Sequence, residues 1–236
     1  MNGTLLEESI ELANQAFEVS SSLSFPMWPQ ERDSGLLETY WHIVLLGSLC
    51  RANKALRSIT RLLDSSLEDT VSAAILNRHL FECAANLIYI GRDYRHTLPE
   101  FLKKSKFPGY PRELEELHSE FVENLFADVP SRRWKKVDTI CRDLGWKDEL
   151  KSIYRVTSDT SHGGSSALLP EFYELHDISV SDRNKAHIVS TGLVYHLRIA
   201  EVIAKNFPDK MDLTKIASLQ KSNFALGWRI AGSSDD

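Results

Sequence analysis

The chain has 236 residues, of which 42% are hydrophobic and 26% charged, enough for one domain with a sizeable core. Its formal net charge of −5 provides no overall attraction to nucleic acid or to anionic membranes, so a nucleic-acid role would need a local basic patch. The three dispersed cysteines, Cys50, Cys83 and Cys141, argue against a disulfide scaffold or a zinc ribbon and favour a reducing compartment.

The N-terminal sequence and the apolar runs bear on localisation. The stretch "MNGTLLEESIELANQ" is acidic and lacks the basic-then-apolar pattern of a signal peptide. The longest apolar run, "IVLLGSLC", is far too short to span a bilayer. We therefore expect a soluble cytoplasmic protein that does not engage a membrane.

Apolar residues recur at helical spacing along most of the chain, and glycine and proline stand between these segments. No stretch shows the alternation of several successive strands. The helices predicted in chain order are residues 4–22, 35–63, 66–94, 97–105, 111–126, 132–144, 147–161, 182–206 and 212–228.

Helix-capping signals fix several of these boundaries. Ser66 is expected to be the N-cap of the third helix, with Glu68 and Asp69 in its first turn. Gly145 is expected to end one helix, and Ser181 or Asp182 to cap another.

The predicted fold class is therefore all-α, a single-domain bundle of long antiparallel helices. Residues 1–34 form an N-terminal helix and a proline-containing connection, residues 35–206 the bundle core, and residues 207–236 a C-terminal helix and tail.

Arg78 and Glu82 lie four residues apart on the helix predicted over 66–94, which is apolar nearly all round. One interpretation is a structural ion pair or ordinary surface charge. The other is a pair that faces a polar pocket or orients a catalytic group. A buried pair would cost about 3–5 kcal/mol when one partner is removed, because the other charge is stranded.

A second polar pattern, "YRVTSDTSHGGSS", covers residues 154–166. Tyr154, Ser158 and His162 are four residues apart and share one stripe of a helix, whereas Arg155 and His162 are seven residues and about 10 Å apart along it. The plain interpretation is a helix C-terminus at which a histidine interacts favourably with the helix dipole. The functional interpretation is a site, with Gly163 allowing the sharp turn that follows.

The segments "NRHLFE" and "YRVTSDTSHGG" together resemble the family catalogued as domain of unknown function 5677. Its members share an Arg–Glu pair on an internal helix and a Tyr-x3-Ser-x3-His stripe followed by small residues. The resemblance carries over to Arg78, Glu82, Tyr154, Ser158 and His162. It implies a helical fold similar to HEPN domains.

HEPN ribonucleases and toxins use an Arg and a His separated by a short spacer, and Arg155 and His162, with six residues between them, fit that pattern. The resemblance implies metal-independent RNA cleavage with no cofactor, within a toxin or a defence effector. His162 would act as general acid or base and Arg155 would stabilise the transition-state charge. Tyr154 and Ser158 complete the implied catalytic set, and a homodimer would supply two copies of each residue.

"SRRWKKVD" is the one compact basic cluster of the sequence. Cations on both sides of an aromatic ring can contact phosphates while the ring stacks on a base. The alternative is a solvated helix start with the tryptophan packed inward. The candidate nucleic-acid-binding residues are Arg132, Arg133, Trp134, Lys135 and Lys136.

No sequence motif for a metal or a nucleotide cofactor is present: there is no HExxH, phosphate loop, GxGxxG or GxSxG. Two function classes beside the ribonuclease remain open. One is a non-catalytic helical module that binds a nucleotide, an RNA or a protein partner, and the other is a structural scaffold.

Overall fold

The computed structural model of the protein describes residues 4–21, 36–64, 69–104, 134–161 and 180–232, and for Leu36, Lys104 and residues 155–161 the backbone alone. Every regular element in these residues is a helix, which confirms the predicted all-α class. The helices are α1 (Leu5–Ser21), α2 (Leu36–Asp64), α3 (Thr70–Arg92), α4 (Tyr94–Lys104), α6 (Val137–Leu144), α7 (Lys147–Ser161), α9 (Asp182–Asn206) and α10 (Leu213–Gly232). None of these helices combines the length and the apolar character needed to cross a membrane.

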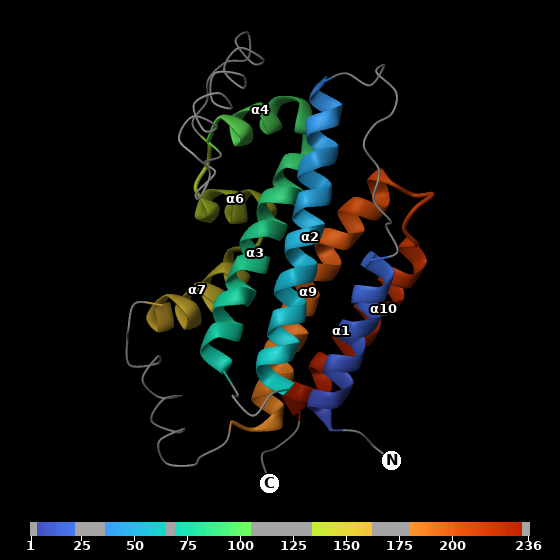
Figure 1. Cartoon of the computed structure of the whole chain (residues 1–236). Coiled ribbons are helices and arrows are strands. Elements are labelled where there is room, and N and C mark those ends of the chain that lie inside the picture. The colour runs from blue at the N-terminus through green and yellow to red at the C-terminus, as the bar shows by residue number, and fades with distance from the viewer. Residues whose placement is uncertain (1–3, 22–35, 65–68, 105–133, 162–179, 233–236) are drawn as a thin grey trace, which may run out of the picture.

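The central helix of the bundle is α9, which packs against α1, α2, α3 and α10. α2 and α3 lie side by side, and the shorter helices α4, α6 and α7 pack along α3 (Figure 1). The many apolar residues of α9 are thus largely covered within one chain.

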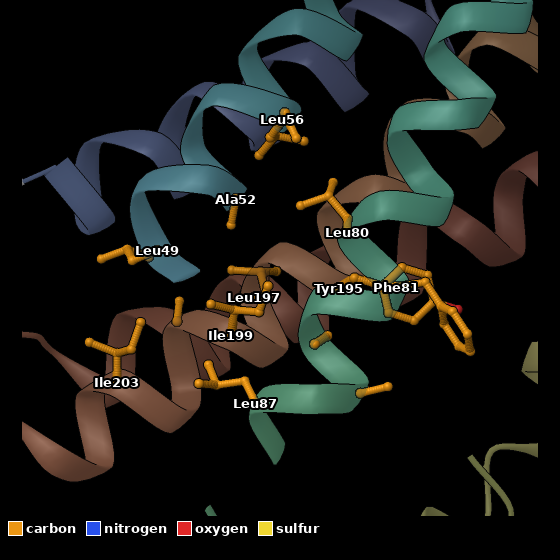
Figure 2. Packing of buried hydrophobic residues seen from close by; sticks show 14 of the residues in the cluster. Leu49, Ala52, Leu56, Leu80, Phe81, Leu87, Tyr195, Leu197, Ile199 and Ile203 are labelled. Carbon is orange, nitrogen blue, oxygen red and sulfur yellow. The ribbon is translucent and has the colours of Figure 1, made fainter. Parts of the chain in front are cut away.

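The core lies where α2, α3 and α9 meet (Figure 2). Phe81 and Leu197 are almost completely inaccessible, and burying a side chain of this size stabilises the fold by about 1.5–3 kcal/mol. Ala13 and Ala16 of α1 and Ile216 of α10 join the same cluster. The N- and C-terminal helices therefore share the core of the central bundle.

Three helix starts differ from the predicted ones by three residues or more, among them that of α4, which begins at Tyr94 rather than at residue 97. The N-cap of α3 is Asp69, not Ser66, because the Asp69 carboxylate accepts a hydrogen bond from the Ser72 amide at 2.8 Å. α6 begins at Val137, since Lys136 has extended backbone at the cap position. The predicted helix 111–126 lies outside the described residues.

Two helix-capping predictions are confirmed. Gly145 ends α6 in the left-handed conformation, with φ 79°, which only glycine adopts without strain. Ser181 caps α9 and accepts a hydrogen bond from the Asn184 amide.

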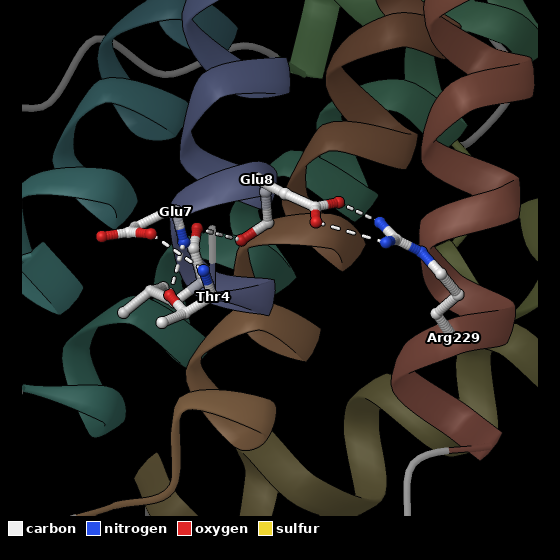
Figure 3. Close-up of polar contacts among 6 residues, drawn as sticks. Thr4, Glu7, Glu8 and Arg229 are labelled. Atoms are coloured by element: carbon white, nitrogen blue, oxygen red, sulfur yellow. Dashed lines mark hydrogen bonds and ion pairs between the residues drawn. The ribbon is translucent and has the colours of Figure 1, made fainter. Parts of the chain in front are cut away.

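α1 is capped at its start and fastened to α10 by one ion pair (Figure 3). Thr4 Oγ1 accepts from the Glu7 amide at 3.2 Å, and the Thr4 amide donates to Glu7 Oε2 at 2.8 Å, which is a capping box. The Arg229 guanidinium of α10 pairs with both carboxylate oxygens of Glu8. Hydrogen bonding to Arg229 lowers the Glu8 pKa.

Gly192 of α9 packs tightly against Asn77 of α3 and Ile59 of α2. A Cβ atom at this position would lie 2.5 Å from Asn77 Oδ1 and 3.1 Å from Ile59 Cδ1. Asn77 also donates through Nδ2 to the Ile188 carbonyl at 2.8 Å, which fixes its amide between the two helices. Only glycine therefore fits this crossing.

Gly192→Ala is expected to lower the free energy of unfolding by about 1–2 kcal/mol, because the new methyl group forces α9 away from Asn77. Gly47 of α2 provides the matched control, since a Cβ atom there meets nothing within 4 Å. Gly47→Ala should stabilise by up to ~1 kcal/mol through helix propensity. Urea unfolding of both variants measures the difference, and equal effects would contradict the close approach.

Candidate functional site

Glu82 of α3 joins Arg78 of the same helix to Tyr154 of α7. Arg78 Nε donates to Glu82 Oε1 at 3.1 Å, and the Tyr154 hydroxyl donates to the same oxygen. The Arg78 guanidinium also lies 4.1 Å from the centre of the Tyr154 ring, a cation–π contact. Glu82 therefore contacts both Arg78 and the first residue of the Tyr154–His162 stripe.

The electrostatics of this cluster favour a cationic arginine and a neutral phenol. Burial and the hydrogen bond to Glu82 raise the pKa of Tyr154 to about 12, so the phenol stays protonated at neutral pH. Burial alone would lower the pKa of Arg78, but its hydrogen bonds to Glu82 and Tyr154 outweigh that effect and raise it. The cluster therefore offers a permanent positive charge held in place by a hydrogen-bonded carboxylate.

The pattern of α3, apolar nearly all round, predicted an internal helix, but the Arg78–Glu82 pair on it is only partly buried. The side chains of Arg78 and Glu82 are 28% and 35% exposed, and Ile75 one turn earlier is 41% exposed. This part of α3 is therefore partly open to solvent. A partly solvated pair can take part in binding an anion.

Glu82→Ala is expected to lower the free energy of unfolding by about 1–2 kcal/mol rather than the 3–5 expected for a fully buried pair, since water screens Arg78. Glu18→Ala, at an exposed position of α1, should change it by less than about 0.5 kcal/mol. Chemical denaturation of the two variants tests this. A Glu82→Ala variant as stable as the Glu18→Ala control would show that the carboxylate does not tie α3 to α7.

The Tyr154 ring packs against a group of aromatic side chains. Phe81 packs edge-on against both Tyr154 and Tyr195, and Trp146 contacts Phe81 and Tyr195. Edge-to-face pairs contribute about 0.5–1.5 kcal/mol each beyond their buried area. The Tyr154 ring therefore rests on a rigid aromatic layer that joins α3, α7 and α9.

A second ion pair, which the sequence analysis did not single out, fixes the start of α7. Arg198 of α9 binds Glu149 through two bonds, Nη1 to Oε2 at 2.7 Å and Nη2 to Oε1 at 3.1 Å. Its guanidinium lies 4.3 Å from the centre of the Trp146 ring. An arginine within the apolar run "VYHLRIAEVIA" was the signal that could have pointed to it.

The remaining residues of the predicted catalytic set cannot be placed. The backbone of α7 is helical through Ser161, as predicted, but the side chains of Arg155 and Ser158 lie outside the described residues. His162 follows α7 directly in the sequence and also lies outside them.

In the basic cluster at 131–138 the tryptophan is packed inward, which was the alternative to nucleic-acid binding. Trp134 is 8% exposed and packs edge-on against Tyr89 and Phe101, so its ring is not available to stack on a base. Lys135 pairs with Asp143 at 2.8 Å. Lys136 is exposed, and residues 132 and 133 lie outside the described residues.

The fold and the cluster define an all-α helical-bundle protein in which a carboxylate joins an arginine and a tyrosine across two helices. The family described as "Family of unknown function (DUF5677)" matches residues 42–178, more than half of the chain and the part that includes Arg78, Glu82 and Tyr154. The chain belongs to this family. No curated protein and no solved structure matches the chain.

Proposed function

We propose that the chain is a HEPN-like, metal-independent endoribonuclease whose active site lies along α7, and that it acts as a toxin or defence effector. The observation that supports this most is the Glu82 carboxylate, which binds Tyr154 at the start of the Tyr154–His162 segment. α7 is also anchored through Glu149 to Arg198. A helix held at two points, by a hydrogen bond and by an ion pair, can present its C-terminal half rigidly to a substrate.

In the proposed reaction the RNA 2′-hydroxyl attacks the adjacent phosphorus, the bond from phosphorus to the 5′-oxygen breaks, and a 2′,3′-cyclic phosphate remains. His162 of one protomer removes the 2′-hydroxyl proton, and His162 of a second protomer donates a proton to the departing 5′-oxygen. Arg155 stabilises the extra negative charge on the phosphorane. Arg78 holds a neighbouring phosphate, while Glu82 and Tyr154 position Arg78.

A non-catalytic module that binds RNA or a nucleotide is the second candidate, and one observation favours it. The Tyr154 phenol is protonated at neutral pH and Glu82 already accepts two hydrogen bonds. Neither group suits proton transfer, whereas the cationic Arg78 beside them suits the binding of a phosphate.

The experiment that separates the two candidates is cleavage of end-labelled RNA in EDTA by the wild type, Arg155→Ala and Arg155→Lys. The ribonuclease predicts wild-type cleavage, a loss of about 10²–10³-fold in Arg155→Ala, and partial recovery in Arg155→Lys. RNA binding without cleavage would support the binding module instead. Sedimentation of the same samples tests the dimer, and a wild type that cleaves as a monomer would contradict the shared site.

A further inference from the structure

A groove of about 590 Å³ runs between α9 and α10, away from the Arg78–Glu82–Tyr154 cluster, with which it shares no described residue. Such a volume is typical of small-molecule sites. Its walls include Arg183, His187, Thr191 and Val194 from α9, and Phe224 and Trp228 from α10.

Two aromatic side chains at the rim of the groove are open to solvent. Phe224 and Trp228 are 69% and 68% exposed, the most exposed of the large hydrophobic residues that the structure describes. They are one helical turn apart, with ring centroids at 6.1 Å and planes at 83°. Adjacent exposed aromatic rings on a rigid helix provide faces and edges on which a planar group can stack.

Two buried polar side chains in the floor of the groove, Ser190 and Asn223, are hydrogen-bonded to each other. Ser190 Oγ donates to Asn223 Oδ1 at 2.9 Å, and Asn223 Nδ2 donates to the Ser190 carbonyl at 3.0 Å. Val194 and Ile230 are the larger aliphatic side chains among the described lining residues. The exposed lining is mostly apolar and includes two aromatic rings, which suits the faces of a planar ligand.

The charge around the groove favours an anion. Among its described lining residues there is an arginine and no carboxylate. Arg183 donates from Nε to the Ile230 carbonyl at 2.9 Å and from Nη2 to the Ala231 carbonyl at 3.3 Å, which holds the guanidinium at one end of the groove. A negatively charged ligand complements the Arg183 guanidinium at this end of the groove.

We propose that this groove binds a free nucleoside monophosphate. The base stacks on Trp228 and Phe224, and the phosphate lies at the end of the groove marked by Arg183 and His187. This site is independent of the proposed ribonuclease, because neither its residues nor its ligand takes part in the cleavage.

Calorimetry with AMP, adenosine and inorganic phosphate tests the ligand class on the full chain. AMP is expected to bind saturably, adenosine at least several-fold more weakly, and phosphate alone not measurably at millimolar concentration. Absence of saturable AMP binding up to several millimolar would overturn the proposal, as would adenosine binding as tightly as AMP. Binding of a short oligoribonucleotide but not of AMP would also overturn it.

Surface variants of α10 test the location, since neither rim ring is needed for the core. Trp228→Ala is expected to weaken AMP binding about 10-fold or more, and Trp228→Phe by much less, because a ring remains for stacking. Leu213→Ala, an exposed residue of the same helix outside the groove, should leave binding unchanged. Equal affinity in Trp228→Ala and Leu213→Ala would contradict the site. Concentration-dependent dimerisation abolished by Trp228→Ala would instead assign this face to a second copy.

Discussion

His162→Ala is expected to reduce RNA cleavage by about 10²–10⁴-fold, the usual effect of removing a general acid or base. The melting temperature should change little, because the residue follows the last residue of α7 and precedes two glycines. Single-turnover cleavage in EDTA, together with thermal unfolding of the same samples, measures both quantities. The pH profile of the cleavage rate should show an inflection near the usual histidine pKa of about 6.5 in the wild type. The variant should show no inflection there.

His96→Ala is the matched control for this experiment. His96 is 81% exposed on α4 and pairs with Asp93 of the preceding turn, away from α7. It should retain the wild-type rate. If His162→Ala keeps full activity, or if it instead lowers stability by several kcal/mol, then His162 is a structural anchor and the plain interpretation of a capped helix end is correct.

The second large effect concerns His196 and acid stability. His196 of α9 is completely buried, and its Nε2 lies 2.7 Å from the Asn53 amide oxygen, a neutral group that does not offset a charge on the ring. Burial lowers its pKa to about 4. An unfolded chain binds a proton at this histidine below about pH 6.5, whereas the folded chain does so only near pH 4, so acid favours unfolding across that window. The contribution of His196 to the free energy of unfolding is thus complete above pH 6.5. About 3 kcal/mol of it is lost as the pH drops to 4 and below.

His196→Gln isolates this contribution, because glutamine can donate to Asn53 but does not titrate. The difference between wild type and variant in the free energy of unfolding, from urea titrations between pH 7 and pH 4, gives the histidine term alone. Carboxyl groups with lowered pKa values, such as Glu8 and Glu201, contribute equally to both proteins. Parallel stability curves for wild type and variant would contradict a buried neutral histidine.

Local sequence signals predicted the helices well where those signals are strong. Gly145 and Ser181 each act through the backbone of their own turn, so a single sequence is enough to place them. The predicted start of α3 was wrong because Ser66 and Asp69 are both good N-cap residues, and the local sequence did not decide between them.

The candidate site was only partly predictable, because its contacts join distant segments. The spacing of Arg78 and Glu82 on one helix predicted their pairing, but not their partial exposure, which depends on how much of α3 is covered by α7. No local sequence pattern predicted the contact between Glu149 and Arg198, because the two residues lie on different helices. Trp134 was ambiguous for the same reason: its burial depends on Tyr89 and Phe101.

The most direct test of the proposed function is the chemistry of the RNA ends produced in EDTA. Wild-type protein is incubated with an RNA and with the same sequence carrying 2′-deoxynucleotides throughout, and the products are identified by mass spectrometry. The account predicts 2′,3′-cyclic phosphate and 5′-hydroxyl ends from the RNA, and no cleavage of the deoxy substrate. Absence of any cleavage in EDTA, or cleavage of the deoxy substrate as well, would contradict the proposed mechanism.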